Sequence, residues 1–159
     1  MSNPPQPDPE LRRLAPLVGT WNVEGQTQDS VAGPAGPVTS RETFYWFEGG
    51  YFLVSTYHTV FGKEAPQIGV NYWGYDSAKA RFHIIFFSNN GSFTEEGNRY
   101  EGVVTGANLT FTGPARFTVE LDQNGKVKME ADGTIILRWE LRDSTGDWKH
   151  WMDNKYTKA

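Results

Sequence analysis

Three ionisable side chains, Glu42, His58 and His150, are the candidates for chemistry in this sequence. Each lies in a segment whose side chains alternate between two faces, and each shares a face with aromatic residues. A carboxyl group in an aromatic cavity has a raised pKa, and a neutral imidazole accepts a proton near neutral pH. With a tyrosine that stabilises an oxyanion, such groups could transfer a proton on a bound small molecule.

Each of the three residues also has a purely structural explanation. Glu42 could lie at an exposed rim or pair with Arg41 or Arg138. Each histidine could donate a hydrogen bond to a strand carbonyl or a tyrosine hydroxyl, and we favour this explanation over a catalytic one. A zinc site would require histidines far apart in the sequence to meet across strands, so we expect no metal and no cofactor.

Large apolar side chains could hold a small apolar or aromatic molecule. The chain contains six Trp, seven Tyr and ten Phe, and the four large aromatic residues Trp46, Tyr72, Trp73 and Trp139 are more than the plug of a small barrel requires, so we expect some of them to line a pocket. The alternative is that these side chains simply fill the interior. The candidates for a ligand cavity are Phe44, Trp46, Phe52, Tyr72, Trp139, Trp148, Met152 and Tyr156.

Strand alternation predicts which side chains point inward. In segment 148–157 one face carries Lys149, Asp153 and Lys155, which belong in water. The opposite face is therefore predicted to be interior, and it carries Trp148, His150, Met152 and Tyr156. Segments 39–60 and 67–87 are apolar on both faces, so their orientation stays open. Within 51–60 we favour as interior the face with Phe52 and His58.

The elements that position these residues are strands joined by turns. Asp8 is predicted to cap a short helix that ends near Leu17. Twelve strand-like runs follow, and turn residues such as Gly, Asn and Asp separate many of them. We expect some to merge into about eight to ten strands. The runs are 20–28, 39–47, 51–60, 67–75, 81–87, 92–98, 100–105, 109–112, 116–121, 126–131, 134–142 and 148–157.

Length and composition limit the protein class. A chain of 159 residues is one domain, and we expect a proline-rich flexible tail over residues 1–9 and a single β-barrel domain over 10–159. A net charge of -4 without basic blocks excludes a nucleic-acid footprint, and zero Cys excludes disulfides and thiolate chemistry. Without an apolar span or a signal-peptide pattern, we expect a cytoplasmic protein that does not enter membranes.

Four motifs carry a resemblance to a known family. They are Leu14-x-x-Leu17-Val18-Gly19-Thr20-Trp21, Glu48-Gly49-Gly50-Tyr51-Phe52-Leu53, Tyr72-Trp73-Gly74-Tyr75-Asp76, and Asp147-Trp148-x-His150 followed by Tyr156-Thr157-Lys158. In order and spacing the chain resembles, from about residue 10 onward, bacterial domain-of-unknown-function family 1579. The resemblance implies an all-β, antiparallel barrel of the calycin or lipocalin kind, with distant kinship to lipocalins and nitrobindins. It implies no activity and no catalytic residue.

Three functional hypotheses follow. The first is a barrel that binds a small apolar or aromatic molecule, and a homodimer is compatible with it because some strands are apolar on both faces. The second is a cofactor-independent isomerase, cyclase or lyase that transfers a proton in the cavity. The third, by analogy with nitrobindins, is haem binding through one histidine.

Overall fold

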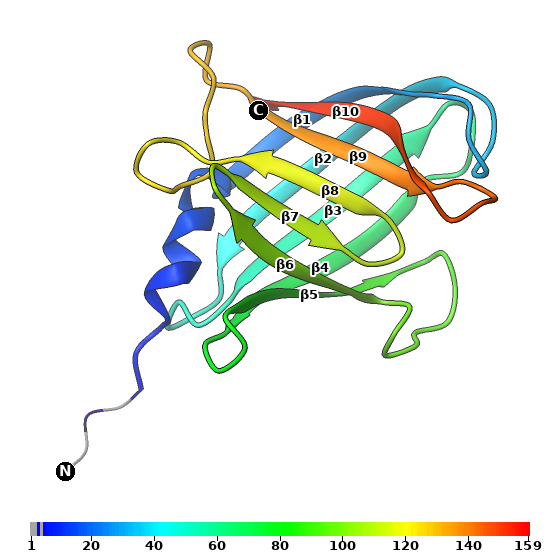
Figure 1. Ribbon diagram of the computed structural model, residues 1–159. Coiled ribbons are helices and arrows are strands. Elements are labelled where there is room, and N and C mark those ends of the chain that lie inside the picture. The colour runs from blue at the N-terminus through cyan, green and yellow to red at the C-terminus, as the bar shows by residue number, and fades with distance from the viewer. Residues whose placement is uncertain (1–2, 4) are drawn as a thin grey trace.

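Ten antiparallel strands form a closed barrel in the computed structural model of the protein, which describes residue 3 and residues 5–159. The strands follow one another around the barrel in chain order, and β1 pairs with β10 to close it (Figure 1). The predicted fold class, an antiparallel barrel with a short N-terminal helix, is confirmed. The elements are a 3-10 helix η1 (Pro9–Leu17), β1 (Gly19–Thr27), β2 (Gly36–Trp46), β3 (Leu53–Phe61), β4 (Gln67–Asp76), β5 (Arg81–Ser88), β6 (Arg99–Thr105), β7 (Asn108–Thr112), β8 (Arg116–Glu120), β9 (Ile135–Arg142) and β10 (Trp148–Lys158).

Two of the predicted strand runs are wrong. Segment 92–98 is a loop in which Asn98 Oδ1 accepts from the Thr94 N–H at 3.1 Å and Thr94 Oγ1 accepts from the Gly97 N–H at 3.0 Å. Segment 126–131 contributes only an isolated bridge, and the Val127 N–H donates to Arg13 O of η1 at 2.8 Å. Local side-chain bonds and a contact with the helix therefore replace strand pairing in these two segments.

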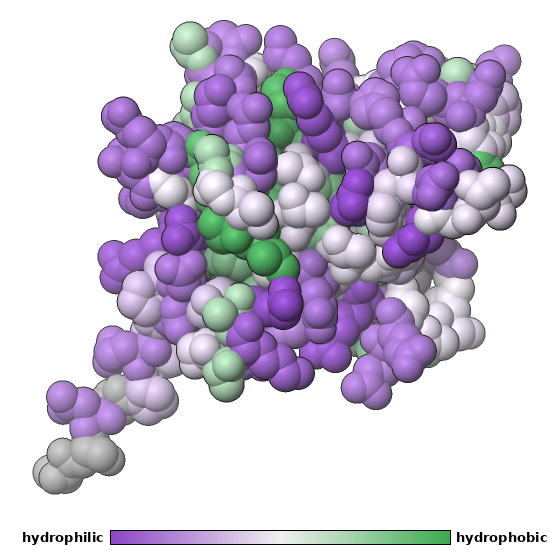
Figure 2. Space-filling model, in the orientation of Figure 1, coloured by the Kyte–Doolittle hydropathy of each residue, from purple (hydrophilic) through white to green (hydrophobic). Residues whose placement is uncertain are grey.

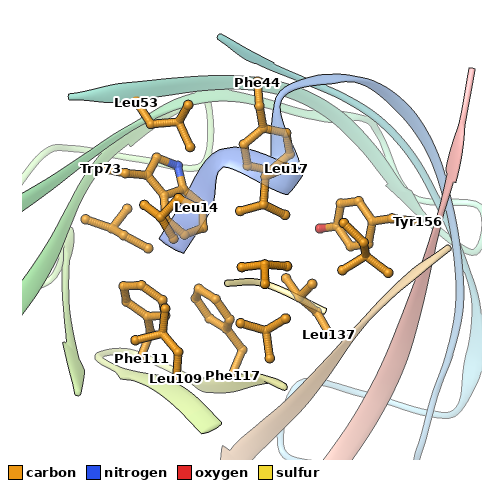
Figure 3. Close-up of a cluster of buried hydrophobic side chains, with 14 of the residues drawn as sticks. Leu14, Leu17, Phe44, Leu53, Trp73, Leu109, Phe111, Phe117, Leu137 and Tyr156 are labelled. Atoms are coloured by element: carbon orange, nitrogen blue, oxygen red, sulfur yellow. The ribbon is translucent and has the colours of Figure 1, made fainter. Parts of the chain in front are cut away.

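The helix η1 closes one end of the barrel. Asp8 caps it as predicted, because its Oδ1 accepts from the Glu10 N–H at 2.9 Å. Leu11, Leu14 and Leu17 are buried along its inner side, and Figure 3 shows Leu14 and Leu17 among the side chains of the surrounding strands. Burying each leucine contributes about 1.5–3 kcal/mol, so this end is filled with apolar side chains.

Trp21 joins the helix to the barrel wall. Its side chain is 0% exposed, and its Nε1 donates to Leu17 O at 2.6 Å. Lys158 Nζ lies 4.4 Å from the ring centroid and donates to Val18 O at 2.7 Å. Gly19 has φ +131°, and a Cβ there would lie 2.2 Å from Lys158 Nζ. The glycine therefore leaves the space in which the lysine reaches the tryptophan.

The N-terminal segment only partly falls in the described structure, since residues 1, 2 and 4 of the predicted flexible tail lie outside it. Tyr51 Oη donates a hydrogen bond to Pro5 O, and η1 begins at Pro9. A domain boundary at residue 10 stays a prediction. Within the described residues, no helix has both the length and the apolar character required to cross a membrane.

Candidate functional site

A cavity of about 330 Å³ occupies the barrel interior beyond the side chains that pack on η1. Aromatic residues are the largest group in its wall, and every strand except β7 contributes at least one lining residue. Ten aromatic side chains line it: Phe44, Tyr57, Phe61, Trp73, Phe86, Tyr100, Phe117, Trp139, Trp151 and Tyr156. Such a wall suits a flat apolar molecule, because ring faces and edges pack closely against another ring.

A hydrogen-bond network around Glu42 forms the polar part of this wall. Glu42 on β2 is 8% exposed, and Tyr156 Oη on β10 donates to its Oε2 at 3.0 Å. Ser55 on β3 accepts from Asn71 Nδ2 at 2.9 Å and from Trp73 Nε1 at 3.2 Å, both on β4. Because Ser55 Oγ accepts twice, its own proton is available for Glu42, with which it also forms a hydrogen bond. Four strands therefore hold one carboxyl group in place.

Burial sets the ionisation of this network. Desolvation raises the pKa of Glu42 to about 7, and the hydrogen bonds from Ser55, Tyr156 and Asn71 offset only part of that rise. Burial, and then the charge of Glu42, raise the pKa of Tyr156 well above its ordinary value. The same two causes raise the pKa of Tyr57. Near neutral pH the carboxyl group can therefore hold or release a proton, while both phenols stay protonated.

The charge of Glu42 has no counter-ion in the cavity. Among the residues that the structure describes, no Lys, Arg or His side chain lines this space. Two further polar atoms of lining residues, Trp139 Nε1 and Asn154 Oδ1, are buried and form no hydrogen bond with described residues. The cavity thus presents one carboxyl group together with neutral polar side chains, among them Ser40, Thr59 and Gln67.

Several predicted site residues do line the cavity. The inward orientation expected for Met152 and Tyr156 is confirmed, and Figure 3 shows Tyr156 pointing from the barrel wall into the interior. Glu42 also lines the cavity, together with Phe44 and Trp139. Glu42 is thus neither exposed at a rim nor paired with an arginine, which were its structural alternatives.

The inward orientation predicted for Trp148 and His150 is wrong. The β9–β10 register pairs His150 with Glu140 but Met152 with Trp139, so a β-bulge inserts one residue, Trp151, between them. One extra residue moves every side chain before it to the other face. Trp148 consequently lies outside, where two arginine guanidinium groups stack on its ring at 4.9 and 4.2 Å.

His150 itself is a surface residue. Its side chain is 51% exposed, and its Nε2 lies 3.1 Å from Asp153 Oδ1. The bulge that moves His150 outward brings Trp151 to the cavity, where its ring stacks on Phe61 with centroids 5.7 Å apart. Simple alternation places Trp151 on the same face as Lys149 and Lys155, so the bulge accounts for both differences.

The face favoured for segment 51–60 is also wrong. Ser55, Tyr57 and Thr59 belong to the face of β3 that is directed inward, and Tyr57 and Thr59 line the cavity. His58 is exposed on the opposite face, beside Arg41 in the β2–β3 register. Alternation could not distinguish the two faces because both carry apolar residues.

Three of the predicted aromatic candidates also lie away from the cavity. Tyr72 is 40% exposed on the outer face, and the Phe52 ring packs against it with centroids 6.1 Å apart. Trp46 packs against the hydrophobic core and does not line the cavity. In the Tyr72–Trp73 pair it is Trp73 that turns inward, and two adjacent aromatic residues gave no sequence signal to separate them.

The described residues give no basis for a metal or haem site. They contain no group of three or more His, Asp or Glu side chains arranged to hold a metal ion. The three histidines of the chain are all outside the cavity wall, and His58 and His150 are exposed. A haem in this cavity would have no histidine to ligate its iron, so these residues do not fit haem binding through one histidine.

The fold and the cavity define a class of protein: a closed antiparallel barrel with an aromatic-lined interior that contains one buried carboxyl group. The sequence pattern of the family described as "Protein of unknown function (DUF1579)" matches residues 6–158. The chain belongs to this family. A search of curated proteins gave no match. Kinship with calycins, lipocalins and nitrobindins stays a prediction.

Among solved structures, the crystal structure of Rv2717c from M. tuberculosis matches with a TM-score of 0.62 at 14% identity, covering 97% of this chain and 99% of that chain. This likeness is one of fold. The barrel EF1p2_mFAP2b bound to DFHBI has a TM-score of 0.42 at 12% identity and covers 94% of this chain and 99% of that chain. The redesigned barrel mFAP0, also bound to DFHBI, has a TM-score of 0.40 at 13% identity, with 90% and 99% covered. These two barrels differ too much from this one for sites to be compared.

Proposed function

We propose that the protein binds a small apolar or aromatic molecule inside the barrel. The observation that carries the proposal is the cavity of about 330 Å³ with ten aromatic side chains in its wall. Ligand pockets are typically apolar hollows with a few oriented polar groups, and this one lies at the small end of their size range. The closed end, filled by η1, makes the opposite end of the barrel the entrance.

The test is titration with 1-anilinonaphthalene-8-sulfonate and, separately, with uncharged N-phenyl-1-naphthylamine, followed by dye emission. We expect the uncharged dye to bind with a saturating curve at micromolar concentration. A matched pair of variants on β3 places a tryptophan inside or outside: Thr59 lines the cavity, whereas Thr56 is exposed. Thr59→Trp should weaken binding by about 10-fold or more, and Thr56→Trp should leave it unchanged. Unsaturable binding, or equal effects of both variants, would count against a defined internal site.

The geometry of Glu42 supports a second candidate function, proton-transfer catalysis without a cofactor. A buried carboxyl group with a pKa of about 7 is suited to remove a proton from a bound substrate, and the Tyr57 hydroxyl in the same wall can donate to a developing oxyanion. His58 and His150, the other two candidates, are exposed on the outer face and are not part of this proposal.

Exchange of the α-protons of 2-tetralone for deuterium, followed by NMR, tests the catalytic candidate. Wild-type protein should accelerate exchange, with a rate that rises as pH passes through about 7. Glu42→Gln should remove about 10²- to 10⁴-fold of that acceleration while the folded barrel still binds the uncharged dye. If wild type gives no acceleration while dye binding is intact, the protein is a binder only for this class of substrate.

A further inference from the structure

We infer that the cavity prefers an aromatic ligand that carries a positively charged nitrogen, so that the ligand's rings lie among the aromatic side chains and its ammonium group pairs with Glu42. This inference rests on the proposed binding function and specifies the chemical class of the ligand.

The first argument is the unmatched charge. Glu42 is the one acidic residue in the cavity wall, and the described residues supply no cationic side chain there. Arg41, its neighbour on β2, is exposed on the opposite face of the strand. An ionised carboxyl group buried without a counter-ion is costly, and a cation brought by the ligand would remove that cost.

The second argument is the direction of the hydrogen bonds around Glu42. Tyr156, Ser55 and Asn71 all have protons to donate toward the carboxyl group. They stabilise the ionised form and leave acceptor positions on its oxygens. A ligand with N–H donors can use these positions, whereas a carboxylate ligand would meet like charge with no arginine or lysine to offset it.

The third argument comes from the rest of the wall. Aromatic ring faces attract cations and repel anions, and ten aromatic side chains surround this space. Charge, hydrogen-bond direction and ring electrostatics therefore all favour the same ligand class.

Three probes of matched shape test the inference: 2-naphthylmethylamine, 2-naphthalenemethanol and 2-naphthoate, each measured by calorimetry at pH 8. At that pH the amine is protonated and Glu42, with a pKa of about 7, is mostly ionised. We expect the amine to bind about 10-fold or more tightly than the alcohol, and the carboxylate to bind weakest. Lowering the pH to 6 should weaken binding of the amine, because Glu42 becomes protonated. Binding of the alcohol should be unchanged, because Tyr57 and Tyr156, the other titratable groups facing Glu42, stay neutral.

Two charge-removing variants separate the ion pair from general electrostatics. Glu42→Gln should reduce the affinity for the amine to that for the alcohol, while the alcohol changes by no more than about 3-fold. Glu24→Gln removes one negative charge from an exposed position on β1, and it should change neither the affinity for the amine nor the affinity for the alcohol. If none of the three probes binds, the proposed binding function itself fails. If the alcohol binds as tightly as the amine, binding stands and the inference is overturned.

A different observation carries a second inference: we propose that two copies of this chain associate through an aromatic strip on the outer face of β4 and β5, which the β2–β3 connection and the loop after β5 extend. The strip consists of Phe47, Phe52, Tyr72, Phe87 and Phe93. Their rings contact in series, with centroids 4.7, 6.1, 6.3 and 4.7 Å apart. Figure 2 shows the face over β6 to β9, where apolar residues at the centre are surrounded by hydrophilic ones.

The exposed apolar area of this face fits a second copy. Seven apolar residues on and beside the strip are between 39% and 52% exposed: Tyr45, Phe47, Ile68, Tyr72, Ile85, Phe87 and Phe93. With about 150–250 Å² for each aromatic side chain, they expose ~600 Å² together. This is at the upper limit for the largest patch of a monomer and approaches the roughly 800 Å² that each partner contributes to a standard interface. A two-fold axis through Tyr72 would place each strip on the other.

Sedimentation equilibrium of the full chain between about 1 and 100 µM tests the association. We expect a monomer–dimer equilibrium, which Phe87→Glu shifts to monomer. Val103→Glu, a matched change at an exposed apolar residue of β6, should leave the dimer intact. A wild-type monomer at the highest concentration, or a dimer that persists in Phe87→Glu and Tyr72→Glu, would overturn the proposal, because the strip would then serve another partner or none.

Discussion

The two ends of the barrel are built from similar residues but differ in how completely those residues are packed. At the end closed by η1, Trp21 is 0% exposed and its Nε1 has a partner. In the cavity beyond it, Trp139 Nε1 and Asn154 Oδ1 have no partner among the described residues, and the carboxyl group of Glu42 is buried with a raised pKa. The difference shows that one end provides stability while the other keeps space and unpaired polar groups, which cost stability and permit binding.

The largest expected effect is loss of stability at the closed end. Trp21→Ala removes a fully buried ring, its hydrogen bond to Leu17 and its contact with Lys158, and should lower the free energy of unfolding by about 3–5 kcal/mol. Urea denaturation measures this change in the free energy of unfolding. If the alanine variant does not fold, Trp21→Phe, which keeps an aromatic ring, is measured in its place. The Trp21 ring also packs edge-on against Tyr156 of the cavity wall, with centroids 6.4 Å apart, so dye affinity of the folded variant should fall as well; unchanged affinity would show that the two ends are independent.

At the cavity, Glu42→Gln should change the pH dependence of stability. The pKa of Glu42 rises from 4.5 to about 7 on folding, so the folded state binds the proton more tightly and ionisation disfavours it. The stabilisation that protonated Glu42 contributes to the folded state is complete below pH 4.5 and is lost as pH rises through about 7. A pKa difference of about 2.5 corresponds to about 3 kcal/mol. Denaturation of both proteins from pH 4 to 8 should show the slope in wild type alone, and parallel curves would contradict the raised pKa.

A smaller effect is expected where a glycine leaves room for a cavity residue. A Cβ at Gly69 would lie 2.4 Å from Tyr57 Oη and 2.6 Å from Phe87 O, so Gly69→Ala must displace the tyrosine into the cavity. We expect a loss of about 1–3 kcal/mol together with weaker dye binding. Gly74→Ala on the same strand meets nothing within 4 Å and is the matched control. Unchanged dye binding in Gly69→Ala would mean that Tyr57 does not shape the site.

The smallest effects are expected for the two exposed histidines. His58→Ala and His150→Ala should each change stability by no more than about 0.5 kcal/mol and leave dye binding and proton exchange unaffected. Thermal denaturation and the same titrations measure these effects. Loss of binding or catalysis in either variant would contradict the outward orientation of that side chain.

The candidate site was only partly predictable, and β10 shows why. Alternation placed Met152 and Tyr156 correctly but failed for Trp148 and His150, because a bulge adds one residue whose position depends on pairing with β9. Ser55 gave no signal as a site residue. It is buried because Asn71 and Trp73 on the next strand donate to it, and that pairing exists only once the strands are in register.

The sequence by itself determined the helix capped by Asp8 and the run of strands joined by turns, because these follow from capping chemistry, turn residues and local spacing, and the family resemblance implied the barrel. The orientation of β3 and the end of β10, and hence the cavity wall, were decided by the tertiary structure. The physical reason is that a strand with apolar residues on both faces satisfies the hydrophobic effect in either orientation. Only closure of the ring and the register with its neighbours select which face is enclosed.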